Sequence, residues 1–247
     1  MRQKFRNMEQ NIDRELMHAK IAADMKSGKI RILTDVEEKK HTRILYEEAF
    51  DDPKAFVDYY YDEKCIDNII ITEQDAGDIV SMCHMNPYHL MIRGQQIQSY
   101  YLVAVATKRT RRHEGHMSEV LFAAFDRMNS DKIPFCYLLP VTEEIYEWMG
   151  FERICDYAAN TEEDYEQIRK KYDIYCFRDS VYKRRHDIEK RLSASDAGEL
   201  LPEHPVIMAK IINLASFIAM SGLKTDATEK DCLAWLRQQK IYICEEV

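Results

Sequence analysis

Glycine and proline are scarce in this sequence, with seven and six among 247 residues. A collagen-like or proline-rich disordered chain needs far more of both, so these classes are excluded. Internal repeats and low-complexity tracts are also lacking. With 46% hydrophobic and 32% charged residues, the composition is that of a globular protein. Its length suits one large domain, or a standard domain with a smaller companion.

Paired cysteine motifs and long apolar runs are missing as well. No two of the seven cysteines form a Cys-x-x-Cys pair, so neither a zinc site nor a redox dithiol is indicated. No apolar stretch approaches the ~20 residues of a membrane span, and the N-terminus lacks the apolar core of a signal peptide. We therefore expect a cytoplasmic protein with reduced cysteines, no metal and no membrane partner.

An excess of positive charge is also lacking, because the formal net charge is −8. Nucleic-acid binding depends on a basic surface that neutralises phosphates, so no nucleic-acid partner is expected. A negative field would instead attract a cationic amine substrate.

Hydrophobic spacing predicts a mixed α/β chain in four segments. Residues 1–28 have apolar positions near helical spacing and are expected to form an added N-terminal helix. Residues 29–157 are expected to form a layered domain in the order strand, two helices, four strands, helix, strand, short helix, strand. A helical connection over 158–203 then leads to a small C-terminal α/β unit over 204–247.

The four consecutive strands are predicted to form two hairpins. The first joins Asp67–Thr72 to Ile79–Met85, and the second joins Tyr88–Ile92 to Ile97–Ala106. The run from Tyr100 to Ala106 is almost continuously apolar, which is typical of a central strand buried on both faces.

A cationic stretch containing Gly115 follows this strand, and an amphipathic helix begins directly after it. The first turn of a helix has free N–H groups and a positive dipole end, so it can hold a pyrophosphate. Gly115 would let the backbone approach the anion, and Arg111 or Arg112 could add a charged contact. On spacing alone, a strand–turn–helix with a solvated basic loop fits equally well, because G-x-G-x-x-G is absent.

The pattern Arg112-x-x-Gly115-x-Met117 resembles the R-x-x-G-x-(G/A) acyl-CoA signature of GNAT acetyltransferases. With methionine in the last position it is similar to the bacterial Eis-like (enhanced intracellular survival) branch. The likeness continues in order through several further segments, which are Arg43–Phe50, Val80–Met82, Asn86–Tyr88, Val103–Thr107, Pro134–Pro140 and Glu144–Phe151. The fold that it implies is a central mixed, mostly antiparallel sheet flanked by helices.

The resemblance implies that acetyl-CoA is the acyl donor and lies in a V-shaped cleft between two strands. These strands would part near residues 103–105 and 137–141, and the pantetheine arm would pair with the main chain of Val103, Ala104 and Val105. The pyrophosphate would lie on the amides of the following loop and helix start, beside Arg111 and Arg112. The remaining expected cofactor-binding residues are His113, Glu114, Gly115, His116, Met117, Ser118, Val141 and Thr142.

The resemblance also assigns catalytic roles. Tyr146 matches the tyrosine on the short helix after the fifth strand, where a phenol with a pKa near 10 can protonate the departing CoA thiolate. A primary amine, on a small molecule or a protein, would attack the thioester directly. The branch uses its C-terminal carboxylate as general base, here that of Val247, although a frayed acidic terminus fits equally well. His84 and His89 are the alternative bases.

Two features depart from the family pattern. Glu114 stands where small or basic residues are usual, and its carboxylate would repel a pyrophosphate unless it points into solvent. Full-length Eis-like proteins carry two further domains, for which this chain is too short. The acceptor pocket, the base and a homo-oligomeric assembly therefore stay open. The alternative function is a non-catalytic GNAT-fold module that senses acyl-CoA or binds a protein partner.

Overall fold

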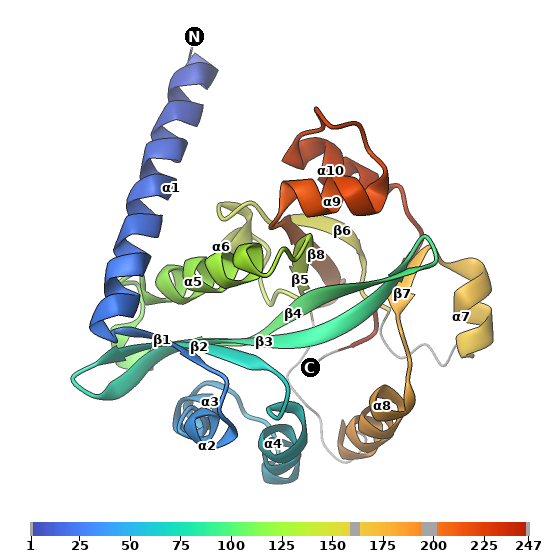
Figure 1. The fold of residues 1–247 in the computed structure, drawn as a ribbon. Helices are drawn as coiled ribbons and strands as arrows, with labels where there is room; N and C mark the ends of the chain where they lie inside the picture. The colour runs from blue at the N-terminus through green and yellow to red at the C-terminus, as the bar shows by residue number, and fades with distance from the viewer. Residues whose placement is uncertain (1, 159–163, 194–201, 246–247) are drawn as a thin grey trace.

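The computed structural model describes residues 2–158, 164–193 and 202–245 (Figure 1). Within them, nine strands form one mixed, mostly antiparallel sheet with helices on both faces. The predicted fold class is thereby confirmed. The long helix α1 leans on α5 with its C-terminal half, while its N-terminal half extends past the body of the molecule.

The elements have the following bounds. The strands are β1 (Ile30–Leu33), β2 (Ile69–Asp75), β3 (Asp78–Ile92), β4 (Gln95–Thr107), β5 (Phe135–Leu138), β6 (Glu152–Asp156), β7 (Ile174–Cys176), β8 (Val206–Ile211) and β9 (Ile241–Tyr242). The α-helices are α1 (Arg2–Ser27), α2 (Val36–Lys40), α3 (Arg43–Ala49), α4 (Lys54–Tyr59), α5 (His116–Ser130), α6 (Glu144–Glu147), α7 (Tyr165–Lys171), α8 (Ser180–Ser193), α9 (Leu214–Ser221) and α10 (Glu229–Arg237).

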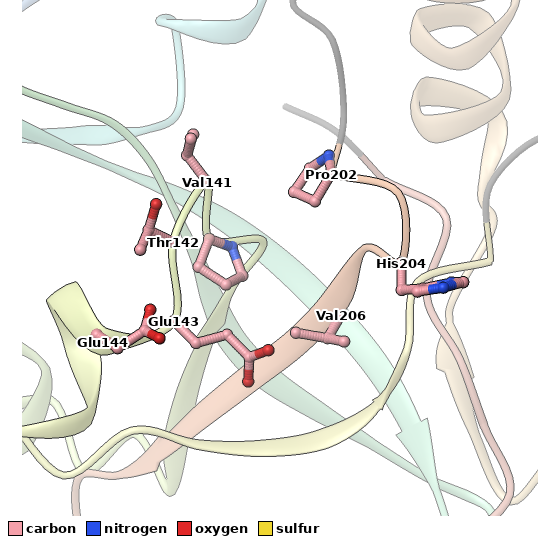
Figure 2. A pocket seen from close by; sticks show the side chains of 8 residues that line it. Val141, Thr142, Glu143, Glu144, Pro202, His204 and Val206 are labelled. Carbon is pink, nitrogen blue, oxygen red and sulfur yellow. The ribbon is translucent and has the colours of Figure 1, made fainter.

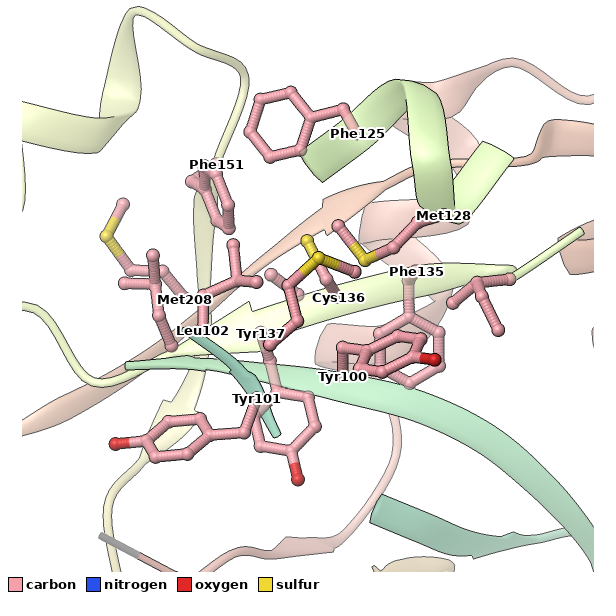
Figure 3. Packing of buried hydrophobic residues seen from close by; sticks show 14 of the residues in the cluster. Tyr100, Tyr101, Leu102, Phe125, Met128, Phe135, Cys136, Tyr137, Phe151 and Met208 are labelled. Atoms are coloured by element: carbon pink, nitrogen blue, oxygen red, sulfur yellow. The ribbon is translucent and has the colours of Figure 1, made fainter. Parts of the chain in front are cut away.

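The main path of the sheet runs β1-β2-β3-β4-β5-β8-β6. Neighbours along it are antiparallel except for β4 and β5, which are parallel. The short strands β7 and β9 extend the sheet beside the far end of β3. Two buried apolar clusters fill the space between the sheet and its helices. In the larger one, Phe125 and Met128 of α5 lie over Cys136 of β5 (Figure 3).

The two predicted strands 79–85 and 88–92 form a single strand, β3, so the expected pair of hairpins is instead a three-stranded meander. Pro87, inside this strand, has no N–H to donate, and proline is normally confined to edge strands or bulges. However, β2 reaches only as far as the pair of Ile69 with Met85, so its side of β3 is unpaired at Pro87. β4 continues along the other side, where Pro87 lies opposite Tyr100.

The C-terminal part of the chain completes the central sheet. β8 lies between β5 and β6, with Met208 opposite both Leu138 and Arg153, and all six β8 residues are buried. β8 and β9 belong to the predicted C-terminal unit 204–247, and both lie in the same sheet as β1–β6. Residues 194–201 of the predicted connection lie outside the described residues. The limits of the four predicted segments stay a prediction.

We expect Ile207→Ala to lower the free energy of unfolding by about 2–5 kcal/mol, because Ile207 is fully buried at the centre of β8. Chemical denaturation measures this loss. The matched control is Ile145→Ala, whose side chain is 42% exposed, and it should stay within about 0.5 kcal/mol of the parent protein. An equally small effect at Ile207 would contradict the burial of β8.

Candidate functional site

The parallel strands β4 and β5 stay together for only two residue pairs, Tyr100 with Cys136 and Tyr101 with Tyr137. β5 then ends at Leu138, while β4 continues to Thr107. From Leu102 onward, the edge of β4 that faces β5 therefore has no strand partner in the described part of the chain. The predicted parting of two strands near residues 103–105 is confirmed.

A β-bulge lies at this point on β4. His84 of β3 pairs with Val103 and Met82 pairs with Ala106, so Ala104 and Val105 together face one residue of β3. Ala104 has a φ of 50°, which is uncommon for a residue with a Cβ. Because a bulge bends its strand and interrupts the ladder, it presents the main chain of Val103–Val105 at the opening between β4 and β5.

The loop after β4 leads directly to the N-terminus of α5. Gly115 is the N-cap with a φ of 94°, and His113 also has a positive φ of 67°. Gly115 provides no side-chain cap, and the Ser118 amide donates to the Gly115 carbonyl at 3.0 Å, so the amides of His116 and Met117 stay available to an anion. A Cβ built on Gly115 would meet no atom closer than Ser118 Oγ, at 3.9 Å. The backbone is thus open to a ligand on that side.

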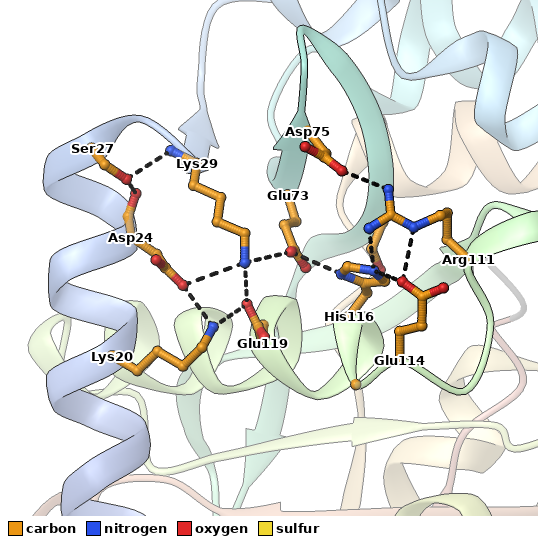
Figure 4. Close-up of polar contacts among 12 residues, drawn as sticks. Lys20, Asp24, Ser27, Lys29, Glu73, Asp75, Arg111, Glu114, His116 and Glu119 are labelled. Atoms are coloured by element: carbon orange, nitrogen blue, oxygen red, sulfur yellow. Dashed lines mark hydrogen bonds and ion pairs between the residues drawn. The ribbon is translucent and has the colours of Figure 1, made fainter.

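A buried carboxylate anchors this loop (Figure 4). Glu73 of β2 is fully buried, and its Oε1 lies 2.8 Å from both Lys29 Nζ and His116 Nδ1. On the other edge of the imidazole, Nε2 lies 3.1 Å from Glu114 Oε2 and 3.2 Å from Arg111 Nη2. The side chain of His116 is therefore turned into the protein, away from a ligand on the helix amides.

Arg111 is held by two carboxylates. Its guanidinium donates to Asp75 at 2.6 Å and to Glu114 at 2.9 Å. The hydrogen bond from Arg111, and then that from His116, lower the pKa of Glu114. The predicted repulsion between Glu114 and a pyrophosphate is thus offset by an adjacent cation. Arg109, Arg112 and His113 are exposed, and Arg109 contacts Glu48 of α3.

Tyr146 approaches the bulge from α6. Its ring is partly buried and packs edge-on against Phe151, with 5.8 Å between ring centroids. Burial, and secondarily the thiol of Cys83, raise its pKa above the ordinary value. Cys83 is the β3 residue opposite the bulge, and Tyr146 packs against the apolar cluster that contains Cys83. The hydroxyl stays protonated at neutral pH.

Val141 and Thr142 lie at a neighbouring cavity of about 230 Å³ (Figure 2). The cavity separates the turn after β5 from the start of β8, and Glu143 and Glu144 make one side of it acidic. Its lining residues are Pro140, Val141, Thr142, Glu143, Glu144, Pro202, His204 and Val206. Both predicted cofactor residues here are exposed, and none of the residues that line this cavity comes from β4.

The predicted bases have different surroundings. His84 is completely buried, its Nδ1 lies 3.0 Å from the Tyr60 hydroxyl, and the two rings stack. Burial, and secondarily the charge of Lys39, lower the pKa of His84 to about 3. It is a neutral core residue. His89 is exposed, five residues further along β3, and Val247 lies outside the described residues.

Sequence reasoning missed Glu73 and Lys29. The available signal was the position of Glu73 directly after the run Ile69–Thr72. A charged residue that continues a buried strand needs a partner of opposite charge or a hydrogen-bond donor. Within residues 2–158, 164–193 and 202–245, no group of three or more His, Cys, Asp or Glu side chains could hold a metal ion. No helix in these ranges is long and apolar enough to cross a membrane.

The buried imidazole of His84 predicts a specific acid sensitivity. Its pKa is about 3 in the folded chain and 6.5 ordinarily, so between these values the unfolded chain binds a proton that the folded chain does not. Stability should therefore fall as pH falls below 6.5, by about 1.4 kcal/mol per pH unit from this group. Urea denaturation from pH 7 to 4 should give a shallower slope for His84→Gln and an unchanged slope for exposed His89→Gln. Parallel slopes for parent and His84→Gln would refute a neutral, buried His84.

Residues 29–154 match a family model described as an acetyltransferase (GNAT) domain. A GCN5-related N-acetyltransferase from Anabaena variabilis is similar in fold, with a TM-score of 0.53 and 10% identity over 78% of this chain and 75% of that one. Eis1 from Mycobacterium abscessus gives 0.52 and 13% identity over 68% of this chain and 49% of that one.

A probable N-acyltransferase from Enterococcus faecalis is 19% identical over 51% of this chain, with a TM-score of 0.48. The aligned part spans only 32% of that protein, as it spans about half of Eis1. No curated protein matches the chain. The family model covers just over half of the sequence, from β1 to β6, and with it the bulged strand and the loop that carry the site. By this match, the chain belongs to the GNAT acetyltransferase family.

Proposed function

We propose that this protein is an N-acetyltransferase that moves the acetyl group of acetyl-CoA to a primary amine. The observation that carries the proposal is that the unpaired edge of β4 is followed, after one loop, by the open N-terminus of α5. The unpaired, bulged edge at Val103–Val105 suits an extended arm with amide groups, and the open first turn of α5 suits a pyrophosphate. Acetyl-CoA contains both groups in one molecule.

In this proposal the main chain of Val103–Val105 pairs with the pantetheine arm. The pyrophosphate lies on amides between His113 and Ser118. Arg112 supplies a charged contact, because it is exposed, whereas Arg111 is already paired with Asp75 and Glu114. Arg111, Glu114 and His116 hold the loop in shape. Val141 and Thr142 border the reacting end of the cofactor.

The acceptor nitrogen attacks the carbonyl carbon of the thioester, so that a C–N bond forms and the C–S bond breaks. The departing thiolate of CoA takes the proton of the Tyr146 hydroxyl, and the nitrogen loses a proton to a base. The raised pKa of Tyr146 keeps this proton in place until the thiolate forms. Direct attack involves no covalent enzyme intermediate.

The acceptor is a small-molecule or protein amine. Glu143 and Glu144 beside the cavity, together with the net charge of −8, favour an acceptor that carries positive charge. We assign the chain to the bacterial Eis-like branch on the Arg112-x-x-Gly115-x-Met117 pattern, and to the cytoplasm on its seven free cysteines.

Gly115→Glu should abolish or weaken acetyl-CoA binding by at least about 30-fold, because it places a carboxylate beside the proposed pyrophosphate site. Calorimetric titration with acetyl-CoA and CoA measures this change. Gly94→Glu is the matched control. It introduces the same side chain at a positive φ of 78°, with no atom within 4 Å of its Cβ, in the turn at the opposite end of β4.

Saturable binding by the parent and by Gly94→Glu, lost in folded Gly115→Glu, would support the enzyme. A folded parent protein that binds neither acetyl-CoA nor CoA would exclude it. The second candidate, a non-catalytic interaction module, would then be favoured. The observation on its side is the pairing of Arg111 with two carboxylates, which leaves that cation neutralised beside the cofactor loop.

Tyr146→Phe should lower kcat about 100-fold, because it removes the proposed acid without removing the ring that packs on Phe151. The KM for acetyl-CoA should change by less than about threefold. The measurement is thiol release from acetyl-CoA, with an acceptor found by screening amines. Tyr175→Phe, on β7, is the control. A kcat equal to that of the parent protein would remove Tyr146 from the mechanism.

A further inference from the structure

An aromatic surface that the reaction does not use lies over the outer side of α5. Trp148, directly after α6, has 62% of its surface exposed, although tryptophan is highly buried on average. Its ring centroid lies 6.4 Å from that of Phe122 on α5, with 50° between the planes. On the other side of Phe122, the ring of His18 on α1 also lies at 6.4 Å. We call Trp148 and Phe122 the aromatic platform.

The platform begins one helical turn beyond the proposed pyrophosphate site. Phe122 follows Ser118 by four residues, so both lie on the same face of α5, about 6 Å apart along its axis. Helix α6 connects the platform to the reacting end of the cofactor. Tyr146 packs inward on Phe151, while Trp148, two residues later, points outward.

We infer that the aromatic platform binds the adenine ring of acetyl-CoA, with the purine stacked on Trp148. The inference rests on the proposed function. A pyrophosphate on the first turn of α5 has two substituents, and the pantetheine arm is directed toward the bulge of β4. We place its other substituent, the nucleotide, over the helix face that carries Ser118 and Phe122, because that face leads from the first turn to the exposed indole. A planar purine gains most from an exposed indole, which has a large π-face.

Trp148→Ala should raise the Kd for acetyl-CoA about 5- to 30-fold, within the range known for base stacking on aromatic side chains. The Kd for S-acetyl-4′-phosphopantetheine, which has no adenine, should be unchanged. Trp148→Phe retains an aromatic face and should recover most of the affinity. Ile145→Ala removes another exposed apolar side chain of α6 and should change neither constant.

Fluorescence gives a readout that a structural role alone would not produce. The chain has two tryptophans, so Trp235→Phe leaves Trp148 as the single indole. CoA should quench its emission saturably, whereas phosphopantetheine should not. Equal loss of affinity for both donors in Trp148→Ala, or unchanged emission at CoA saturation verified by calorimetry, would overturn the inference. Tight binding of acetyl-CoA by Trp148→Ala would overturn it and leave the proposed function intact, whereas no binding by the parent would exclude both.

Discussion

The carboxylate of Glu73 links three parts of the molecule that are distant in sequence. It is completely buried, and a buried charge is tolerated only with charged or hydrogen-bonding partners. Lys29, just after α1, and His116, in the first turn of α5, provide them. Lys29 also contacts Glu119 at 3.0 Å, and Lys20 of α1 contacts the same carboxylate at 2.6 Å. The N-terminal helix, β2 and the start of α5 are thereby fixed to one another around one charge.

The parting of β4 and β5 depends on a different strand. A strand that leaves its neighbour exposes unpaired N–H and C=O groups, which is costly inside a protein. β8 does not satisfy the groups that β5 turns toward β4, but it holds β5 from its other edge, where it pairs with all four β5 residues, from Phe135 opposite Ile211 to Leu138 opposite Met208. β4 is likewise held by β3 on its other side along almost its whole length. Each strand is thus anchored away from the opening, and the gap between them needs no support of its own.

Local features could be predicted from the sequence, and long-range ones could not. The central strand that contains Tyr100–Ala106 is buried as expected, and a helix begins directly after Gly115 as the sequence predicts. The joining of the predicted strands 79–85 and 88–92 through Pro87 depends on where β2 begins, and no local window of sequence shows this. The position of β8 between β5 and β6 was missed for a similar reason. An apolar sequence predicts that a strand is buried, but it does not predict which strands lie on either side of it.

The charges of the loop were predicted only in part, since their partners come from other elements. Arg111 looked like a phosphate ligand by its position, yet Asp75 of β2 and Glu114 compete for its guanidinium. Of the groups near the proposed pyrophosphate, the main-chain amides of His116 and Met117 keep their donors free when the side chains of the loop pair with one another. Binding of acetyl-CoA to this chain would then depend more on the backbone geometry, which Glu73 and the bulge of β4 determine, than on the number of positively charged side chains. Glu114 can therefore stand beside the proposed pyrophosphate site. Its carboxylate contacts Arg111 and His116 and so stabilises the loop that holds the amides in position.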